Sequence, residues 1–204
     1  MNNFVNIKTN SLSALRAAAA DCKACDLWKR ATQTVFGAGE KRAALLFVGE
    51  QPGNDEDLQG KPFVGPAGQL LDRALIDAGI DRSQAYVTNV VKHFKWEQRG
   101  KRRLHKKPNS LEISACLPWL EKEIALVKPD LVIALGATAA QALLGSSVRV
   151  LKDRGQVLES KFARQVLVTV HPSSILRAPD EAARDREYRQ FVRDLSKVGN
   201  LAAL

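Results

Sequence analysis

The sequence lacks the features of a membrane or secreted protein. No apolar run reaches the length of about 18 residues that is needed to cross a bilayer, and the polar residues 1–10 contain no apolar segment typical of a signal peptide. Three cysteines are too few for a disulfide framework, so we expect buried thiols or metal ligands in a reducing compartment. Neither an internal repeat nor a linker divides the chain. We therefore expect a cytoplasmic monomer with a single domain over residues 1–204.

Positive charge is concentrated in one segment. Residues 92–107 contain eight Lys or Arg and one Glu, and so carry +7 of the chain's formal net charge of +9. A local concentration of this kind is typical of a phosphate-binding surface and favours nucleic acid as the partner. His105 lies in its most basic part, where an imidazole could act on nucleic acid. The alternative is a solvated basic loop.

Apolar runs and amphipathic stretches alternate along the chain. Continuous apolar runs predict strands buried on both faces, and helical periodicity with capping patterns predicts helices. The expected strands span 43–48, 85–91, 130–135 and 165–170, and the expected helices span 11–20, 65–78, 110–127, 137–144 and 180–198. We expect a basic loop at about 92–108 and an edge hairpin within 148–159. This alternation predicts an α/β fold whose parallel sheet is covered by helices on both faces.

Polar residues follow three of the predicted strands. In a parallel sheet, ligands bind where the carboxyl ends of the strands meet. Glu50 would place a carboxylate at that edge, and Phe63, in the Gly/Pro-rich segment 60–68, is suited to stacking on a planar base. Asn89 and His171 lie near other strand ends. Taken singly, these residues have ordinary alternatives, namely a turn-rich loop, a core Phe and a hydrogen-bonded strand-end His.

Three cysteines and one histidine make a complete set of four metal ligands. These are Cys22, Cys25, His93 and Cys116. On their chemistry alone, three thiolates and one imidazole suit zinc and an iron–sulfur cluster equally well. The alternative is three unrelated buried thiols.

Four motifs taken together resemble the iron–sulfur uracil-DNA glycosylases. They are GEQPG at 49–53, GKPFVGPAG at 60–68, TNVVK at 88–92 and HPSSILR at 171–177. Within that family, the Gln of GEQPG and the long loop with KRRLH at 101–105 resemble the UdgX-like branch, whose members excise uracil and stay covalently attached to DNA through the loop histidine. His93 departs from the usual cysteine, but imidazole can replace thiolate, as it does in Rieske centres.

The resemblance implies a three-layer α/β/α sandwich around a four-stranded parallel sheet. It also implies a 4Fe-4S cluster, with zinc as the alternative, that ties down the N-terminal segment through Cys22, Cys25, His93 and Cys116. The substrate would be uracil-containing DNA, preferably single-stranded, and free uracil would be a product.

The resemblance further implies roles for individual side chains. A flipped uracil would be bound by Gly49, Gln51, Phe63, Asn89 and Ser173. His171 would stabilise the departing uracil. His105 would attack C1′ in place of water, assisted by Glu50, and the DNA backbone would contact Lys101, Arg102 and Arg103. Two alternatives stay open: a multi-turnover glycosylase in which His105 contacts phosphate, and a metal-stabilised nucleic-acid-binding module without chemistry.

Overall fold

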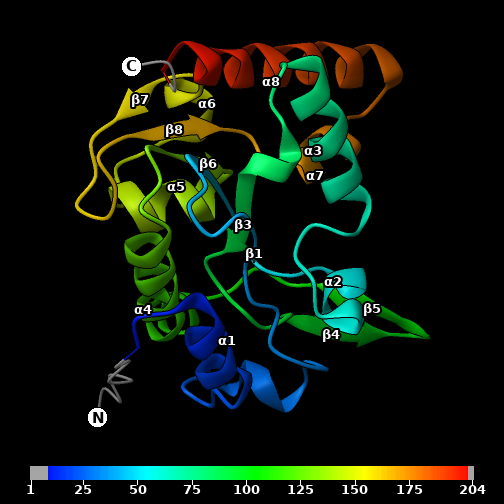
Figure 1. Cartoon of the computed structure of the whole chain (residues 1–204). Coiled ribbons are helices and arrows are strands. Elements are labelled where there is room, and N and C mark those ends of the chain that lie inside the picture. Colours follow the sequence, from blue (N-terminus) through cyan, green and yellow to red (C-terminus); the bar gives the residue numbers. More distant parts are fainter. Residues whose placement is uncertain (1–8, 202–204) are drawn as a thin grey trace.

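A central sheet lies between two layers of helices (Figure 1). The computed structural model describes residues 9–201; residues 1–8 and 202–204, which the predicted domain includes, lie outside the described part. The sheet order is β1-β3-β2-β6-β8-β7. Its strands are β1 (Ala38–Gly39), β2 (Leu45–Gly49), β3 (Ala85–Asn89), β6 (Leu131–Leu135), β7 (Val157–Leu158) and β8 (Val166–Thr169). The middle four strands are parallel, as predicted, and the two edge strands pair antiparallel.

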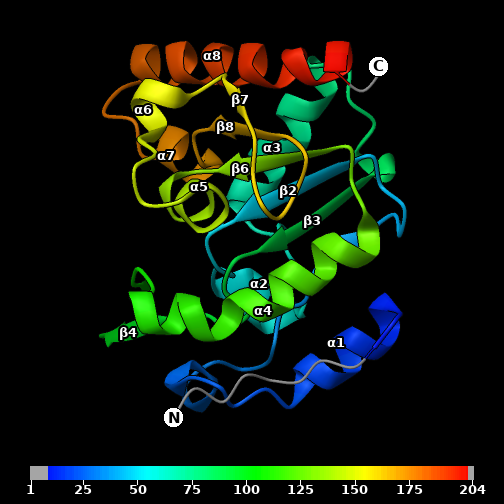
Figure 2. The ribbon, with the colours of Figure 1, turned by 90° about the vertical axis from the view of Figure 1, so that its left-hand side faces the viewer.

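Alternate residues of the strands face opposite helical layers. In β2, Leu46 and Val48 pack in one core cluster, while Phe47 packs in the other. The first layer comprises α1 (Leu12–Ala20), α4 (Ser110–Val127) and α5 (Ala137–Leu144). The second comprises α3 (Pro66–Asp77), α7 (Pro172–Leu176) and α8 (Glu181–Leu201). Figure 2 shows α8 on one side of the sheet and α4 with α1 on the other, so the predicted three-layer α/β/α sandwich is confirmed.

The long predicted helices are present, and several short elements were missed. Asn109 caps α4 in a capping box with Glu112, as the sequence pattern predicted. The missed elements include the strand β1, the helices α2 (Asn54–Gln59) and α7, and the 3-10 turns η1 (Asp26–Lys29) and η2 (Arg82–Gln84). The predicted edge hairpin within 148–159 is wrong, because α6 (Val150–Asp153) occupies its first half and β7 pairs with β8.

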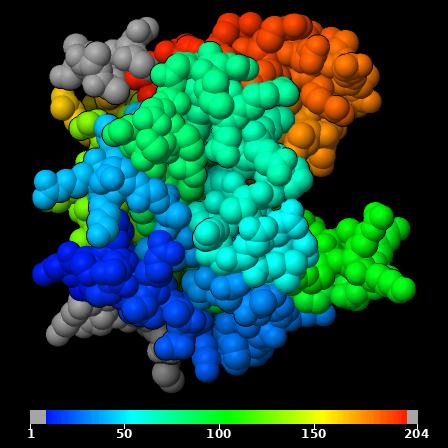
Figure 3. Space-filling view, turned by 45° about the vertical axis from the view of Figure 1, so that its right-hand side comes forward, coloured from blue at the N-terminus to red at the C-terminus, as the bar shows by residue number. Residues whose placement is uncertain are grey.

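The expected basic loop is instead largely a β-hairpin. Its strands are β4 (Trp96–Arg99) and β5 (Arg102–His105), and Gly100 takes a positive φ of 58° in the turn. Trp96 pairs directly with His105. Both strands are mostly polar, so no apolar alternation marked them in the sequence. The hairpin stands out from the body of the molecule, in green in Figure 3.

The helices among residues 9–201 are all too short or too polar to cross a membrane.

Candidate active site

A cavity of about 810 Å³ lies at the carboxyl edge of the parallel sheet. The predicted residues Glu50, Phe63, Asn89, His105 and His171 all line it. Because β2, β3 and β8 all end at this edge, residues far apart in the sequence meet there. The structure therefore brings the sequence-predicted pocket residues together in one cavity.

Three of these side chains converge on Gly49. A Cβ atom placed on Gly49 would lie 2.4 Å from Asn89 Oδ1, 2.8 Å from Phe63 Cζ and 3.4 Å from His171 Nε2. Any larger residue would collide with the first two, so glycine is required at this point. Asn89 is 3% exposed and Phe63 8% exposed, which gives an apolar wall beside a buried amide. This combination suits a flat, polar-edged ligand such as a nucleobase.

His171 presents a fixed hydrogen-bond donor. Its Nδ1 accepts a hydrogen bond from the backbone N–H of Ser173 at 3.1 Å, so the hydrogen of the neutral ring resides on Nε2. Burial, followed by the nearby positive charge of Arg177, lowers the pKa of His171 to about 4. The ring stacks near Phe63, with centroids 6.2 Å apart. At neutral pH, Nε2–H is therefore available to an acceptor beside the Phe63 ring.

The loop that carries Phe63 is held in an unusual conformation. Phe63 has a positive φ of 57°, and a Cβ on Gly68 would lie 1.9 Å from the Phe63 carbonyl oxygen. Glu56 accepts hydrogen bonds from the backbone N–H groups of Gly53, at 3.0 Å, and Gly65, at 2.7 Å. Sequence reasoning missed Glu56, although a Glu three residues after the N-cap Gly53 is the sequence signal for such a cap.

His105 and Glu50 face each other at the mouth of the cavity. His105 Nε2 lies 3.4 Å from Glu50 Oε1, and the other carboxylate oxygen of Glu50 accepts a hydrogen bond from the Thr138 hydroxyl. Burial lowers the pKa of His105; Glu50 opposes this effect and Arg177 adds to it. The imidazole is therefore neutral and nucleophilic at physiological pH. Thr138 was missed, and the only available signal was its position just after strand β6.

Gln51 holds the hairpin rather than aiming its amide at the pocket. Its Nε2 donates to the backbone oxygens of Lys95, at 3.3 Å, and Lys106, at 2.9 Å. Its Oε1 accepts from the Lys95 N–H at 2.9 Å. Gln51 lines the cavity as predicted, but its side chain joins the two strands at the hairpin base.

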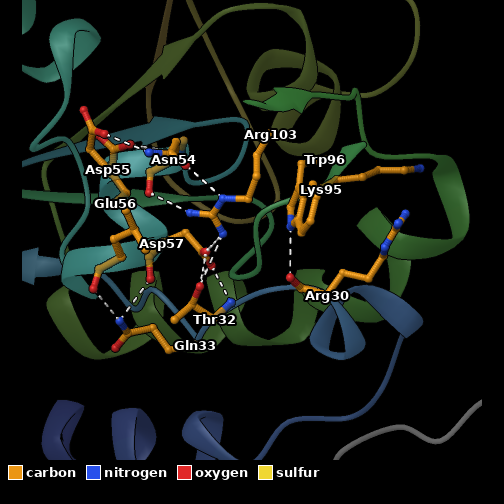
Figure 4. Close-up of polar contacts among 12 residues, drawn as sticks. Arg30, Thr32, Gln33, Asn54, Asp55, Glu56, Asp57, Lys95, Trp96 and Arg103 are labelled. Atoms are coloured by element: carbon orange, nitrogen blue, oxygen red, sulfur yellow. Dashed lines mark hydrogen bonds and ion pairs between the residues drawn. The ribbon is translucent and has the colours of Figure 1, made fainter. Parts of the chain in front are cut away.

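Half of the basic side chains in residues 92–107 form ion pairs with carboxylates of the same chain. The pairs are Lys92–Glu123, Lys95–Glu112, Arg103–Asp57 and Lys106–Glu97. No such pair is found for Arg99, Lys101, Arg102 and Lys107 within the described part of the chain. Of the three predicted DNA-backbone residues, Lys101 and Arg102 are thus exposed, while Arg103 donates at 2.6 Å to the fully buried Asp57 (Figure 4).

A buried ion pair supports Asn89 from behind. The Lys92 ammonium donates to the Asn89 carbonyl oxygen at 2.6 Å, to Thr88 Oγ1 at 2.7 Å and to Glu123. Tyr86 donates to the same Glu123 carboxylate at 2.8 Å. Burial and the Glu123 charge raise the pKa of Tyr86, so its hydroxyl stays a donor. This network fixes the end of β3, from which the Asn89 side chain enters the cavity.

Two of the predicted metal ligands lie next to Lys92, because His93 follows it in the chain and Cys116 contacts its backbone. Cys22, Cys25 and Cys116 belong to one packing cluster, and Cys116 Sγ accepts the Lys92 backbone N–H at 3.2 Å. His93 Nε2 lies 2.9 Å from Thr34 Oγ1, whose own hydrogen is donated to the Ala19 carbonyl.

The donor set is compatible with a metal in its chemistry, although the described residues show no group of three metal-binding side chains gathered at one point. Burial raises the pKa of Cys116 to about 12, so a bound cation would be needed to keep that thiolate. With Nε2 of His93 donating to Thr34, Nδ1 keeps the lone pair, an arrangement that metal-binding histidines commonly show.

Fold and cavity together define an α/β protein with an enzyme-type pocket for a planar ligand, bordered by a basic hairpin. Residues 36–196 match the uracil DNA glycosylase superfamily, and the chain belongs to it. It is 38% identical over 175 residues to a type-4 uracil-DNA glycosylase of Pyrobaculum aerophilum, covering 82% of this chain and 86% of that protein. A type-4 uracil-DNA glycosylase of Thermotoga maritima is 37% identical over 179 residues, covering 87% of each.

Proposed function

We propose that this protein excises uracil from DNA and then becomes covalently attached, through His105, to the sugar left behind. The observation that carries the proposal is the position of a neutral His105 beside Glu50, at the mouth of a cavity lined by Phe63, Asn89 and His171. A glycosylase that uses water alone has no need of a nucleophile at this position.

Excision would begin with a flipped uracil stacked on Phe63. The Asn89 amide would bond to the polar edge of the base, and His171 Nε2–H would donate to a carbonyl oxygen. When the bond between C1′ and N1 breaks, its electron pair goes to uracil. The His171 donor stabilises that negative charge without a proton transfer, because the ring is already neutral. Cytosine would present an amino donor where uracil presents an oxygen, leaving buried partners unpaired.

Capture would follow on the oxocarbenium-like sugar. An unprotonated nitrogen of His105 forms a new bond to C1′ with its lone pair. The ring then loses the hydrogen of its other nitrogen, with Glu50 as the nearest carboxylate, and the uracil anion gains a proton. The products are an N-alkylated imidazole on DNA and free uracil. Water is a poor displacing group for this bond without a positioned base, so the complex persists after one turnover.

Cys22, Cys25, His93 and Cys116 would hold a 4Fe-4S cluster in this proposal. The cluster would tie the N-terminal segment to α4 and to the end of β3, and no chemical step needs it. A brown protein that contains equal amounts of iron and sulfide supports this assignment. A colourless protein with one zinc per chain would support the four ligands and contradict the assignment of an iron–sulfur cluster.

A denaturing gel with a uracil-containing single-stranded oligonucleotide tests the proposal. Covalent capture gives a shifted band that survives boiling, and we expect it to form faster with single-stranded than with duplex DNA. Strand cleavage after alkali without a shifted band would instead establish the multi-turnover glycosylase. Neither product would leave a binding module without chemistry. Unchanged behaviour with cytosine in place of uracil would contradict the assigned base selectivity.

A further inference from the structure

The hairpin that carries His105 needs support from outside itself. An isolated two-stranded hairpin is marginally stable at best in water. Gln51 holds the base of this hairpin, but β4 and β5 extend beyond that point, away from the sheet (Figure 1). Trp96 is the residue paired directly with His105 across the two strands. Whatever fixes Trp96 therefore fixes the backbone position opposite His105.

Trp96 is fixed by the segment that follows the two N-terminal cysteines. Its Nε1–H donates to the Arg30 carbonyl oxygen at 2.9 Å. The guanidinium carbons of Arg30 and Arg103 lie 5.2 Å and 5.4 Å from the centre of the indole ring. Figure 4 shows the indole between these two side chains, with the hydrogen bond directed to Arg30. Such cation–π contacts stabilise a ring in a fixed place.

The same segment is joined to the hairpin a second time through Arg103. Arg103 Nη1 donates to Asp57 Oδ2 at 2.6 Å and to Thr32 Oγ1 at 3.3 Å. Thr32 in turn donates its backbone N–H to Asp57 Oδ1 at 2.9 Å. Arg30 and Thr32 therefore form a platform that contacts both strands of the hairpin. Within the described part of the chain, no hydrogen bond joins these two residues to the pocket residues on β2, β3 and β8.

We propose that Trp96 is a positioning residue that docks the hairpin on residues 30–32 and thereby keeps His105 against Glu50. This inference rests on the proposed covalent function of His105. The dock controls which fate follows excision: a held imidazole captures the sugar, whereas a displaced one leaves C1′ to water. Misplacement of a reacting group by 1 Å can lower a rate by about 100-fold.

The test compares Trp96→Ala and Trp96→Phe with Gln98→Ala as the matched control. Gln98 lies on the same hairpin, and its side chain bonds only to Gly100 in the turn, within the residues described. On one uracil-containing oligonucleotide, the fraction of excised uracil that ends in a boiling-resistant adduct is measured for each protein. We expect Trp96→Ala to lower this fraction at least about tenfold, Trp96→Phe to lower it less, and Gln98→Ala to leave it unchanged.

Two further measurements separate positioning from general damage. In Trp96→Ala, the rate of uracil release and the melting temperature should stay close to the wild-type values. The reason is that the pocket and the core are formed by the sheet, whereas Trp96 lies on the hairpin. Hydrogen exchange should accelerate at the hairpin amides, including Lys106 N–H, and remain slow in β2 and β3. An unchanged adduct fraction, or a parallel loss of release and adduct, overturns the inference.

The wild-type protein provides the remaining arm. If it releases uracil and forms no adduct, the proposed covalent function has failed. Hydrogen exchange is then the measurement that tests whether Trp96 docks the hairpin. Unaltered exchange of the hairpin in Trp96→Ala would then overturn it.

Discussion

The pocket and the hairpin are built in opposite ways. The pocket is formed by residues at the ends of strands that are buried on both faces, with Asn89 secured by an ion pair that is itself buried. The hairpin is a polar ribbon at the edge of the molecule, held by side-chain contacts to Gln51, Arg30 and Asp57. In the proposed function, base recognition thus depends on the core, and the placement of the nucleophile His105 depends on surface contacts. The two functions should therefore respond separately to mutation.

The variant His105→Ser should separate uracil excision from covalent capture most completely. The adduct should disappear, because serine without a dedicated base is a poor nucleophile and leaves room for water at C1′. Uracil release should continue with turnover, since His171 and Asn89 are untouched. Gel shift and free-uracil assays measure the two outcomes, and peptide mapping should place the wild-type sugar on His105. An adduct that persists in the variant, or maps to a lysine, would replace this mechanism with a Schiff-base route.

The variant Glu123→Ala should destabilise the buried part of the protein that supports the pocket. Removing one partner of a buried ion pair leaves Lys92 uncompensated, which costs about 3–5 kcal/mol of unfolding free energy. Chemical denaturation measures this loss. Glu97→Ala removes the exposed partner of Lys106 and should cost at most about 1 kcal/mol. Equal losses for the two variants would contradict the contrast between core and surface.

The pH dependence of capture should report His105. Neutral imidazole is the reactive form, so capture is present above the pKa of His105 and lost as the pH falls through it. Burial lowers that pKa, and capture should therefore stay constant from pH 8 to below the ordinary histidine value of about 6.5. Glu50 raises the pKa of His105, so Glu50→Gln should slow capture and move its acid limit to lower pH. A limit that moves to higher pH would contradict the Glu50 contact.

Salt dependence should show the smallest effect. Each phosphate contact contributes about 0.7 to the slope of log affinity against log salt for single strands. The double variant Lys101→Ala with Arg102→Ala should lower the steepness of this slope by the contribution of up to two phosphate contacts. Arg103→Ala should leave the slope nearly unchanged, because Asp57 already neutralises this side chain. An equal change for Arg103→Ala would restore Arg103 as a DNA contact.

The sequence predicted the pocket better than the hairpin for a physical reason. Glu50, Asn89 and His171 follow apolar runs, and the edge at which parallel strands end is set by topology. Trp96, Thr138 and the side-chain role of Gln51 depend on contacts between segments far apart in the chain, which no local pattern encodes. The basic segment shows the same limit of sequence-based prediction. Its positive charges could be read from the sequence, but the carboxylates that pair with Lys92 and Arg103 could not.

The two ends of the hairpin meet, because Lys106 N–H donates to the Lys95 carbonyl oxygen at 2.9 Å. The chain therefore leaves and re-enters the body of the molecule at neighbouring points, and we expect a short turn in place of residues 96–105 to leave the sheet intact. The same junction offers an engineering route, in which the hairpin that carries the proposed nucleophile is transplanted to another base-excising scaffold together with its docking residues.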